Sequence, residues 1–232
     1  RARLAAPTGR AAKRMTEATS RDAVTLHRLL EFDPKTGDFG RDDQNPLDLA
    51  ALVVDESSMV DLQLFAALLS ALPTGARLVL VGDVDQLPSV GPGAVLRDII
   101  DSRVVPTARL TAVFRQAEGS RIVENAHRIH GGEPPVSEKG NKGEFYVVER
   151  IGDQESADAV IEVVTQRIPR SFGFDPIRDV QVLTPMHRGE AGTAKLNERL
   201  QAAVNPAGVS VKVGQRLYRL GDKVMQLKND YE

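Results

Sequence analysis

The sequence predicts an α/β fold of two lobes, in which parallel sheets are flanked by helices. Short apolar runs alternate with segments of helical periodicity, the pattern of strand–helix–strand units in a parallel sheet. Two of the apolar runs end in polar residues, at Asp55-Glu56 and at Gly82–Gln86. The length of 232 residues gives room for two compact lobes. We place the first at residues 1–111 and the second at 112–232.

The first lobe is expected to begin with a strand that ends at residues 4–6 and a helix over residues 10–19. Thr8 precedes this helix, and a threonine hydroxyl there accepts a hydrogen bond from a free N–H group of the first turn. Further along the lobe we expect helices over residues 23–31, 60–72 and 94–101, and strands over residues 50–54 and 77–81. A loop rich in glycine and proline occupies residues 82–93.

The second half of the chain also contains both helix and strand patterns. We expect helices over residues 120–129, 156–167 and 193–203, and strands over residues 145–149 and 180–183. Residues 215–227 are expected to form a strand pair that turns at Gly221-Asp222. The pattern therefore predicts a second α/β lobe.

Composition excludes several classes of protein. The sequence has no cysteine, which excludes disulfides, thiolate zinc sites and a cysteine nucleophile. It has no apolar run long enough to span a membrane and no secretory signal at its start, so we expect a cytoplasmic protein with no membrane partner.

Charge is unevenly distributed along the chain. The net charge of −2 favours neither presence nor absence of a nucleic-acid partner. The first 30 residues, however, contain seven basic residues against Glu17 and Asp22: Arg1, Arg3, Arg10, Lys13, Arg14, Arg21 and Arg28. Such a stripe is suited to phosphates, although a solvated helix face accounts for it equally well.

The acidic pair Asp55-Glu56 is the main candidate for chemistry. It follows a buried strand, and ligands of open α/β sheets bind at the carboxyl ends of the strands. Mg²⁺ takes hard oxygen ligands and usually keeps several waters, which suits Asp55 as the metal ligand. Glu56 beside it is placed to take a proton from an attacking water. The alternative is a strand that merely ends in solvated acids.

The next strand is followed by Asp83, Asp85 and Gln86. We interpret the two acids as residues that stabilise the loop turn. The uncharged amide of Gln86 is suited to contacting a phosphate at a strand end.

Taken in order, several segments resemble the RecD-type superfamily 1 DNA helicases, which occur as the alpha subunit of exodeoxyribonuclease V and as stand-alone enzymes. The segments cover nearly the whole chain and are APTGRAA at 6–12, VTLHRLL at 24–30, VDESSM at 54–59, GDVDQLPSVG at 82–91, LTAVFRQ at 110–116, LTPM at 183–186, and GDKVMQ at 221–226 with KNDY at 228–231.

The resemblance implies two RecA-like lobes with ATP and Mg²⁺ bound between them and single-stranded DNA across their top. It matches Asp55 and Glu56 to the Walker B motif, Gln86 to the residue that senses the γ-phosphate, and Arg115 to an arginine that reaches ATP from the second lobe. The positions that would face DNA are Pro7, Thr8, Gly9, Arg10, His27, Thr184, Pro185 and Met186. For His27, a structural role within its helix is an equally good interpretation. The family also implies 5′ to 3′ movement in recombination or repair, with other exodeoxyribonuclease V subunits as candidate partners.

One element of this family is absent from the sequence. A P-loop, G-x-x-x-x-G-K-[ST], supplies backbone amides and a lysine for the phosphates, and no such run occurs here. In the family it lies upstream of the first motif seen here. We therefore expect an internal piece of a larger helicase, with an incomplete first lobe and part of a second, that is inactive in ATP hydrolysis by itself.

Two alternatives remain open. One is a non-catalytic module that binds DNA or a protein partner and has kept the fold. The other is the helicase part of a conjugative relaxase, which shares these motifs.

Overall fold

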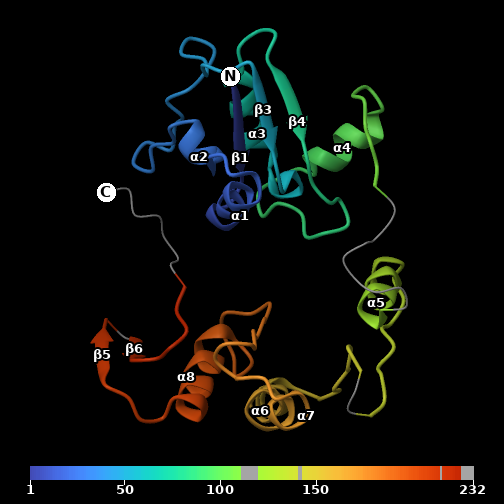
Figure 1. The fold of residues 1–232 in the computed structure, drawn as a ribbon, viewed down its shortest axis with the longest axis vertical. Coiled ribbons are helices and arrows are strands. Elements are labelled where there is room, and N and C mark those ends of the chain that lie inside the picture. The colour runs from blue at the N-terminus through green and yellow to red at the C-terminus, as the bar shows by residue number, and fades with distance from the viewer. Residues whose placement is uncertain (111–119, 141–142, 215, 226–232) are drawn as a thin grey trace. The chain divides into compact units, whose positions relative to one another are not determined.

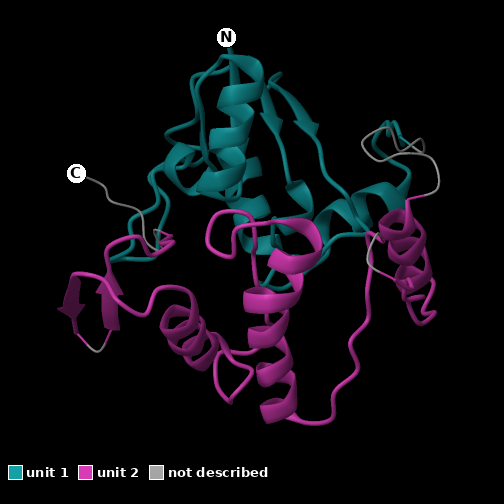
Figure 2. Ribbon diagram, turned by 60° about the horizontal axis from the view of Figure 1, so that its bottom comes forward, with its two compact units in different colours: residues 1–112 teal, residues 113–232 magenta. Residues whose placement is uncertain are grey.

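The computed structural model describes residues 1–110, 120–140, 143–214 and 216–225. The chain divides into two compact units, unit 1 over Arg1–Ala112 and unit 2 over Val113–Glu232 (Figure 2). Among the described residues, no helix is both long and apolar enough to cross a membrane.

Unit 1 is built on a parallel sheet, which confirms the predicted α/β class (Figure 1). Its strands are β1 (Ala2–Ala6), β2 (Ala23–Thr25), β3 (Ala51–Val54) and β4 (Arg77–Leu80), in the order β2-β1-β3-β4. Ala6 pairs with Thr25, Ala5 with Val54, and Val54 with Leu80. The strands therefore all end at one edge of the sheet, called the carboxyl edge below.

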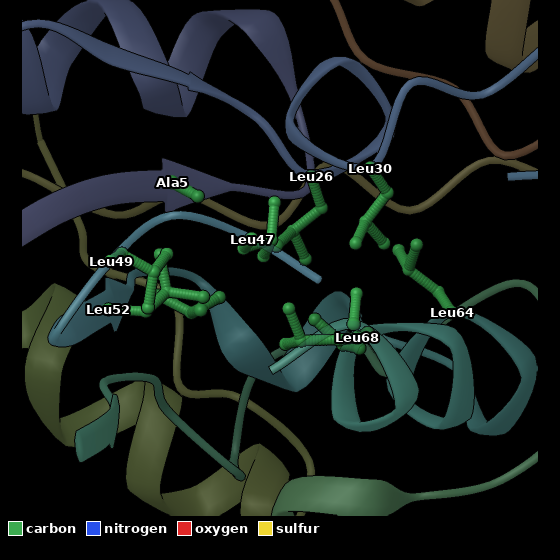
Figure 3. Close-up of a cluster of buried hydrophobic side chains, with 11 residues drawn as sticks. Ala5, Leu26, Leu30, Leu47, Leu49, Leu52, Leu64 and Leu68 are labelled. Atoms are coloured by element: carbon green, nitrogen blue, oxygen red, sulfur yellow. The ribbon is translucent and has the colours of Figure 1, made fainter. Parts of the chain in front are cut away.

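Helices of unit 1 pack on both faces of this sheet because neighbouring strand residues point to opposite faces. Its helical elements are α1 (Gly9–Thr19), α2 (Leu26–Leu29), the short 3₁₀ helix η1 (Ser57–Met59), α3 (Leu62–Ala71) and α4 (Val95–Ser102). On one face, Leu52 and Val54 form a buried core with leucines of α2 and α3, including Leu26 and Leu68 (Figure 3). On the other face, Ala6 packs against Ala11 and Ala12 of α1, where small side chains allow a close approach.

The helix predicted over residues 23–31 is wrong in its first part. Residues 23–25 form strand β2, and only Leu26–Leu29 are helical. Val24 and Thr25 are β-branched, which favours an extended backbone, and β1 provides the strand with which they pair. Thr25 then caps α2, since its hydroxyl accepts a hydrogen bond from the N–H of Arg28 at 3.2 Å.

Unit 2 has helices α5 (Arg121–His130), α6 (Asp153–Glu162), α7 (Ile168–Phe172) and α8 (Thr193–Val204), with a π-helical segment, η2 (Val163–Arg167), between α6 and α7. The single helix predicted over residues 156–167 is therefore wrong in extent. Pro169 has no N–H for the helical ladder, so regular hydrogen bonding cannot continue unchanged through this point.

The strand predictions for unit 2 are also wrong. Residues 145–149 and 180–183 are not in strands in the structure. The hairpin consists of β5 (Ser210–Val213) and β6 (Arg216–Arg219), which pair antiparallel. Gly214, with a φ of +60°, lies in the connection between them, a conformation that glycine adopts readily. Gly221-Asp222 follows the hairpin instead of joining its strands.

Candidate active site

Asp55 and Glu56 lie at the carboxyl edge, directly after β3. The N–H of Asp55 donates to the carbonyl of Ala5 at 3.0 Å, so β1 continues to hold the backbone beyond the strand. Asp55 Oδ1 in turn accepts a hydrogen bond from the N–H of Glu56 at 2.9 Å. Glu56 has a φ of +52°, a left-handed conformation that costs about 1–2 kcal/mol for a residue with a side chain. Such conformations are concentrated at functional sites, where surrounding contacts maintain them.

Ser57 connects this acidic turn to the end of β4. Its N–H and its hydroxyl both donate to the carbonyl of Val81, at 2.9 and 2.7 Å. Ser57 is 2% exposed, so its two donor groups are shielded from water. A Cβ added at Gly82 would lie 2.9 Å from Ser57 Oγ and 3.0 Å from the backbone nitrogen of Ser58. Glycine at residue 82 thus allows the loop after β4 to lie directly against the acidic turn.

Gln86 is carried by that loop and is held by Asp83. The side-chain amide of Gln86 donates to Asp83 Oδ2 at 3.1 Å, and Asp83 Oδ1 accepts the N–H of Asp85 at 3.0 Å. The prediction that Asp83 stabilises the loop turn is therefore confirmed. Asp85 has a different partner, Arg109, at 3.9 Å. Gln86 is exposed at the same edge of the sheet as the acidic pair.

The donor chemistry of this edge fits a magnesium ion. Asp55 is partly buried, and Oδ2 remains as a hard ligand beside the Oδ1 that accepts the Glu56 N–H. Among the described residues there is no group of three or more acidic or histidine side chains arranged to hold a metal. Mg²⁺ does not require one, because it is commonly held by one or two carboxylates together with substrate phosphates and water.

Four candidate DNA-binding positions, Pro7 to Arg10, follow β1 at the same edge. The hydroxyl of Thr8 accepts a hydrogen bond from the N–H of Ala11 at 3.2 Å, which confirms the predicted cap of α1. Gly9 and Arg10 are exposed, and Pro7 and Thr8 are partly buried.

His27 follows β2 and packs against aromatic rings. Its ring meets Phe32 edge-on with centroids 5.2 Å apart, and Phe39 lies 6.1 Å away. Sequence reasoning did not include these two phenylalanines, which the loop after α2 brings together through an isolated bridge. Their contacts hold one side of the partly buried His27 ring.

Thr184, Pro185 and Met186 form part of a loop that folds back on the start of α8 in unit 2. The hydroxyl of Thr184 donates to the carbonyl of Ala191 at 2.8 Å, and the N–H of Thr193 donates to the carbonyl of Met186 at 3.0 Å. A Cβ added at Gly192 would lie 2.4 Å from the carbonyl oxygen of Arg188, so this loop requires glycine there.

Asp222, from the GDKVMQ segment, links the end of the hairpin to α8. Its carboxylate accepts hydrogen bonds from the N–H of Arg219 at 2.7 Å and from the Asn205 side chain at 2.8 Å, and also from the Gln201 side chain. Burial is the largest influence on the pKa of Asp222 and raises it, but these hydrogen bonds and the charge of Arg219 together lower the pKa below its ordinary value. The sequence placed Asp222 in a turn and in the GDKVMQ segment, but did not predict these partners.

Arg115, the expected arginine from the second lobe, falls within residues 111–119, outside the described residues.

Comparison with known proteins finds similar sequences. A family model described as an AAA domain matches residues 1–92. The ATP-dependent RecD2 DNA helicase of Deinococcus radiodurans is 41% identical over 228 residues, which cover 98% of this chain and 30% of that protein. The chain is similar to the RecD-type helicases over nearly its whole length.

Two further relatives match less of the chain. The RecBCD enzyme subunit RecD of Mycobacterium tuberculosis is 45% identical over 56% of this chain and 26% of its own length. A probable conjugal transfer protein TraA of Sinorhizobium fredii is 28% identical over 79% of this chain and 16% of its own length. The chain thus spans less than a third of each of these RecD-type and TraA relatives.

Proposed function

We propose that the chain is part of a motor that hydrolyses ATP to move along single-stranded DNA and separate duplex strands. The observation that carries the proposal is the convergence of Asp55, Glu56 and the Gln86 loop at one edge of a parallel sheet, in a chain similar to the RecD-type helicases. Units 1 and 2 correspond in this proposal to the two motor lobes.

In the proposed mechanism, each polar residue at the carboxyl edge has its own task. Asp55 would hold Mg²⁺ through its carboxylate, and the bound ion would supply positive charge to neutralise the phosphates. Glu56 takes the proton from the water that attacks the γ-phosphate. Gln86 contacts the γ-phosphate, and Arg115 from unit 2 stabilises the charge that develops on it.

DNA contacts are proposed for both units. Pro7, Thr8, Gly9, Arg10 and His27 would contact single-stranded DNA from unit 1, and Thr184–Met186 from unit 2. The exposed residues Gly9 and Arg10, at the start of α1, are suited to phosphates. Closure of the lobes on ATP would change their grip on the strand, and the resemblance supports movement from 5′ to 3′.

The test uses the full-length protein and two forked duplexes, one with a 5′ loading strand and one with a 3′ loading strand. The proposal predicts ATP hydrolysis that single-stranded DNA stimulates, and unwinding of the 5′-tailed duplex alone. DNA binding without any ATP hydrolysis would instead establish the non-catalytic module. Unwinding of only the 3′-tailed duplex would keep the motor and overturn the direction.

A second candidate concerns the setting in which the motor works. The match to the RecD2 helicase covers both units, whereas the match to the RecD subunit of the RecBCD enzyme covers 56% of the chain. We therefore favour an enzyme that works without partner subunits. Co-purification of the native protein with stoichiometric partner subunits would support a complex instead.

A further inference from the structure

We infer that the N-terminus of α3, formed by Asp61 and Leu62 and called the seat below, positions the loop that carries Gln86. Leu62 and Gly91 are the positioning residues. The inference rests on the proposed function, because it assigns these residues to the placement of Gln86 beside the nucleotide. Neither residue carries a chemically reactive group, so both act through the loop.

The first contact of the seat is a backbone hydrogen bond. The N–H of Leu62 donates to the carbonyl of Pro92 at 2.9 Å. Leu62 is the first residue of α3, where an N–H group has no partner within the helix. The carbonyl of Pro92 in the loop thus accepts a hydrogen bond from an N–H group that has no partner within the helix.

The second contact requires glycine at residue 91. Asp61 caps α3 by accepting the N–H of Leu64 on Oδ1 at 2.8 Å. Its other oxygen, Oδ2, lies only 2.1 Å from the position a Cβ on Gly91 would occupy. Asp61 is held by the cap, so a side chain at residue 91 would push the loop away from α3.

The loop is also stiffened internally between Gln86 and the seat. Ser89 Oγ lies 3.0 Å from the carbonyl oxygens of both Gly91 and Gly93. At the other end of the loop, Gln86 is tied to Asp83, and Arg97 of α4 donates to the carbonyl of Val84 at 2.8 Å. Gln86 therefore lies between two anchored ends, and a shift at the seat moves the segment that carries it.

The decisive comparison is Leu62→Pro against Leu62→Ala in the full-length protein. Proline is well tolerated at the first position of a helix, and it removes the N–H that Pro92 accepts. The preceding residue, Asp61, already has the extended backbone that proline requires of its neighbour. Leu62→Ala keeps the N–H, and the side chain it shortens is 57% exposed.

We expect Leu62→Pro to lower kcat for ATP hydrolysis by about tenfold to a hundredfold, as for a displaced catalytic group, with KM for ATP little changed. Leu62→Ala stays within about twofold of wild type. Equal kcat values for the two variants, with melting temperatures like that of wild type, overturn the inference.

A rescue experiment provides a second test if Leu62→Pro fails to fold. Gly91→Ala is expected to lower kcat, and Asp61→Gly in the same protein is expected to restore it, because it removes the atoms that the new Cβ meets while glycine remains an acceptable cap. Loss of activity in Gly91→Ala that Asp61→Gly does not restore contradicts the inference.

Glu56→Gln and Gln86→Ala separate this inference from the proposed function. If both lose ATP hydrolysis while Leu62→Pro and Gly91→Ala retain it, only the seat is wrong. If Glu56→Gln and Gln86→Ala both retain full ATP hydrolysis, the proposed function itself fails.

Discussion

Ser57 donates both its backbone N–H and its hydroxyl to the carbonyl of Val81, and so joins the acidic turn after β3 to the loop after β4. Two hydrogen bonds from the buried Ser57 to one acceptor fix the separation of Glu56 from the segment that leads to Gln86. The proposed base and the proposed phosphate sensor therefore share one rigid support.

Ser57→Ala removes the hydroxyl bond and leaves the backbone bond in place. We expect the free energy of unfolding to fall by about 0.5–1.5 kcal/mol, the usual contribution of one hydrogen bond. Urea denaturation of the wild type and the variant measures the difference. Ser70→Ala, on the exposed side of α3, is the matched control and should change the stability far less. Equal losses in the two variants would contradict the role given to Ser57.

Thr8→Ala removes the cap of α1. Loss of a threonine cap is expected to cost about 0.5–2 kcal/mol, whereas Thr8→Ser keeps the acceptor and most of the stability. Thermal unfolding monitored by circular dichroism distinguishes the two variants. If Thr8→Ser were as unstable as Thr8→Ala, the hydroxyl would not be the stabilising group.

Gly192→Ala places a Cβ 2.4 Å from the carbonyl oxygen of Arg188. The loop of Thr184–Met186 must then move, at a cost of about 1–3 kcal/mol for an overpacked site. The control is Gly208→Ala, because the nearest atom there would lie at an ordinary 3.4 Å. Denaturant unfolding should show a loss for Gly192→Ala and almost none for Gly208→Ala. Comparable stability of the two variants would show that the loop accepts a side chain at residue 192.

Asp222 should make the stability of unit 2 depend on pH. Its pKa is lower in the folded chain than in the unfolded chain, so the ionised form favours folding. This stabilisation is complete above about pH 4, the ordinary range of an aspartate, and is lost as the pH falls through the lower pKa of the folded state. The difference in unfolding free energy between wild type and Asp222→Asn should therefore shrink as the pH is lowered below that range. A difference that stayed constant with pH would contradict it.

The parts of unit 1 that were predictable from sequence are those where local pattern and fold agree. The apolar runs before Asp55 and Gly82 are both strands, although only β3 contains buried residues and β4, at the end of the sheet, is partly exposed. Thr8 caps a helix as threonine commonly does. Strand β2 was missed because three residues are too few to show an alternation, and only its pairing with β1 makes it a strand.

The contacts that organise the site depend on tertiary structure and were not predictable. Ser57 reaches Val81 only because β3 and β4 are adjacent and in register. Gly91 lies against Asp61, and no periodic pattern in the sequence relates these two positions. In unit 2, the same limit applies to Asp222, whose side-chain partners Gln201 and Asn205 lie at the end of α8 and directly after it.

The most direct test of the central claim is ATP hydrolysis by the full-length Glu56→Gln variant in the presence of single-stranded DNA, with nucleotide binding measured in parallel. Glu198→Gln, an exposed glutamate on α8, serves as the control for the same chemical change. If Glu56 is the general base, kcat falls by about a hundredfold or more, ATP still binds, and the control keeps wild-type activity. Wild-type hydrolysis by Glu56→Gln would contradict the account.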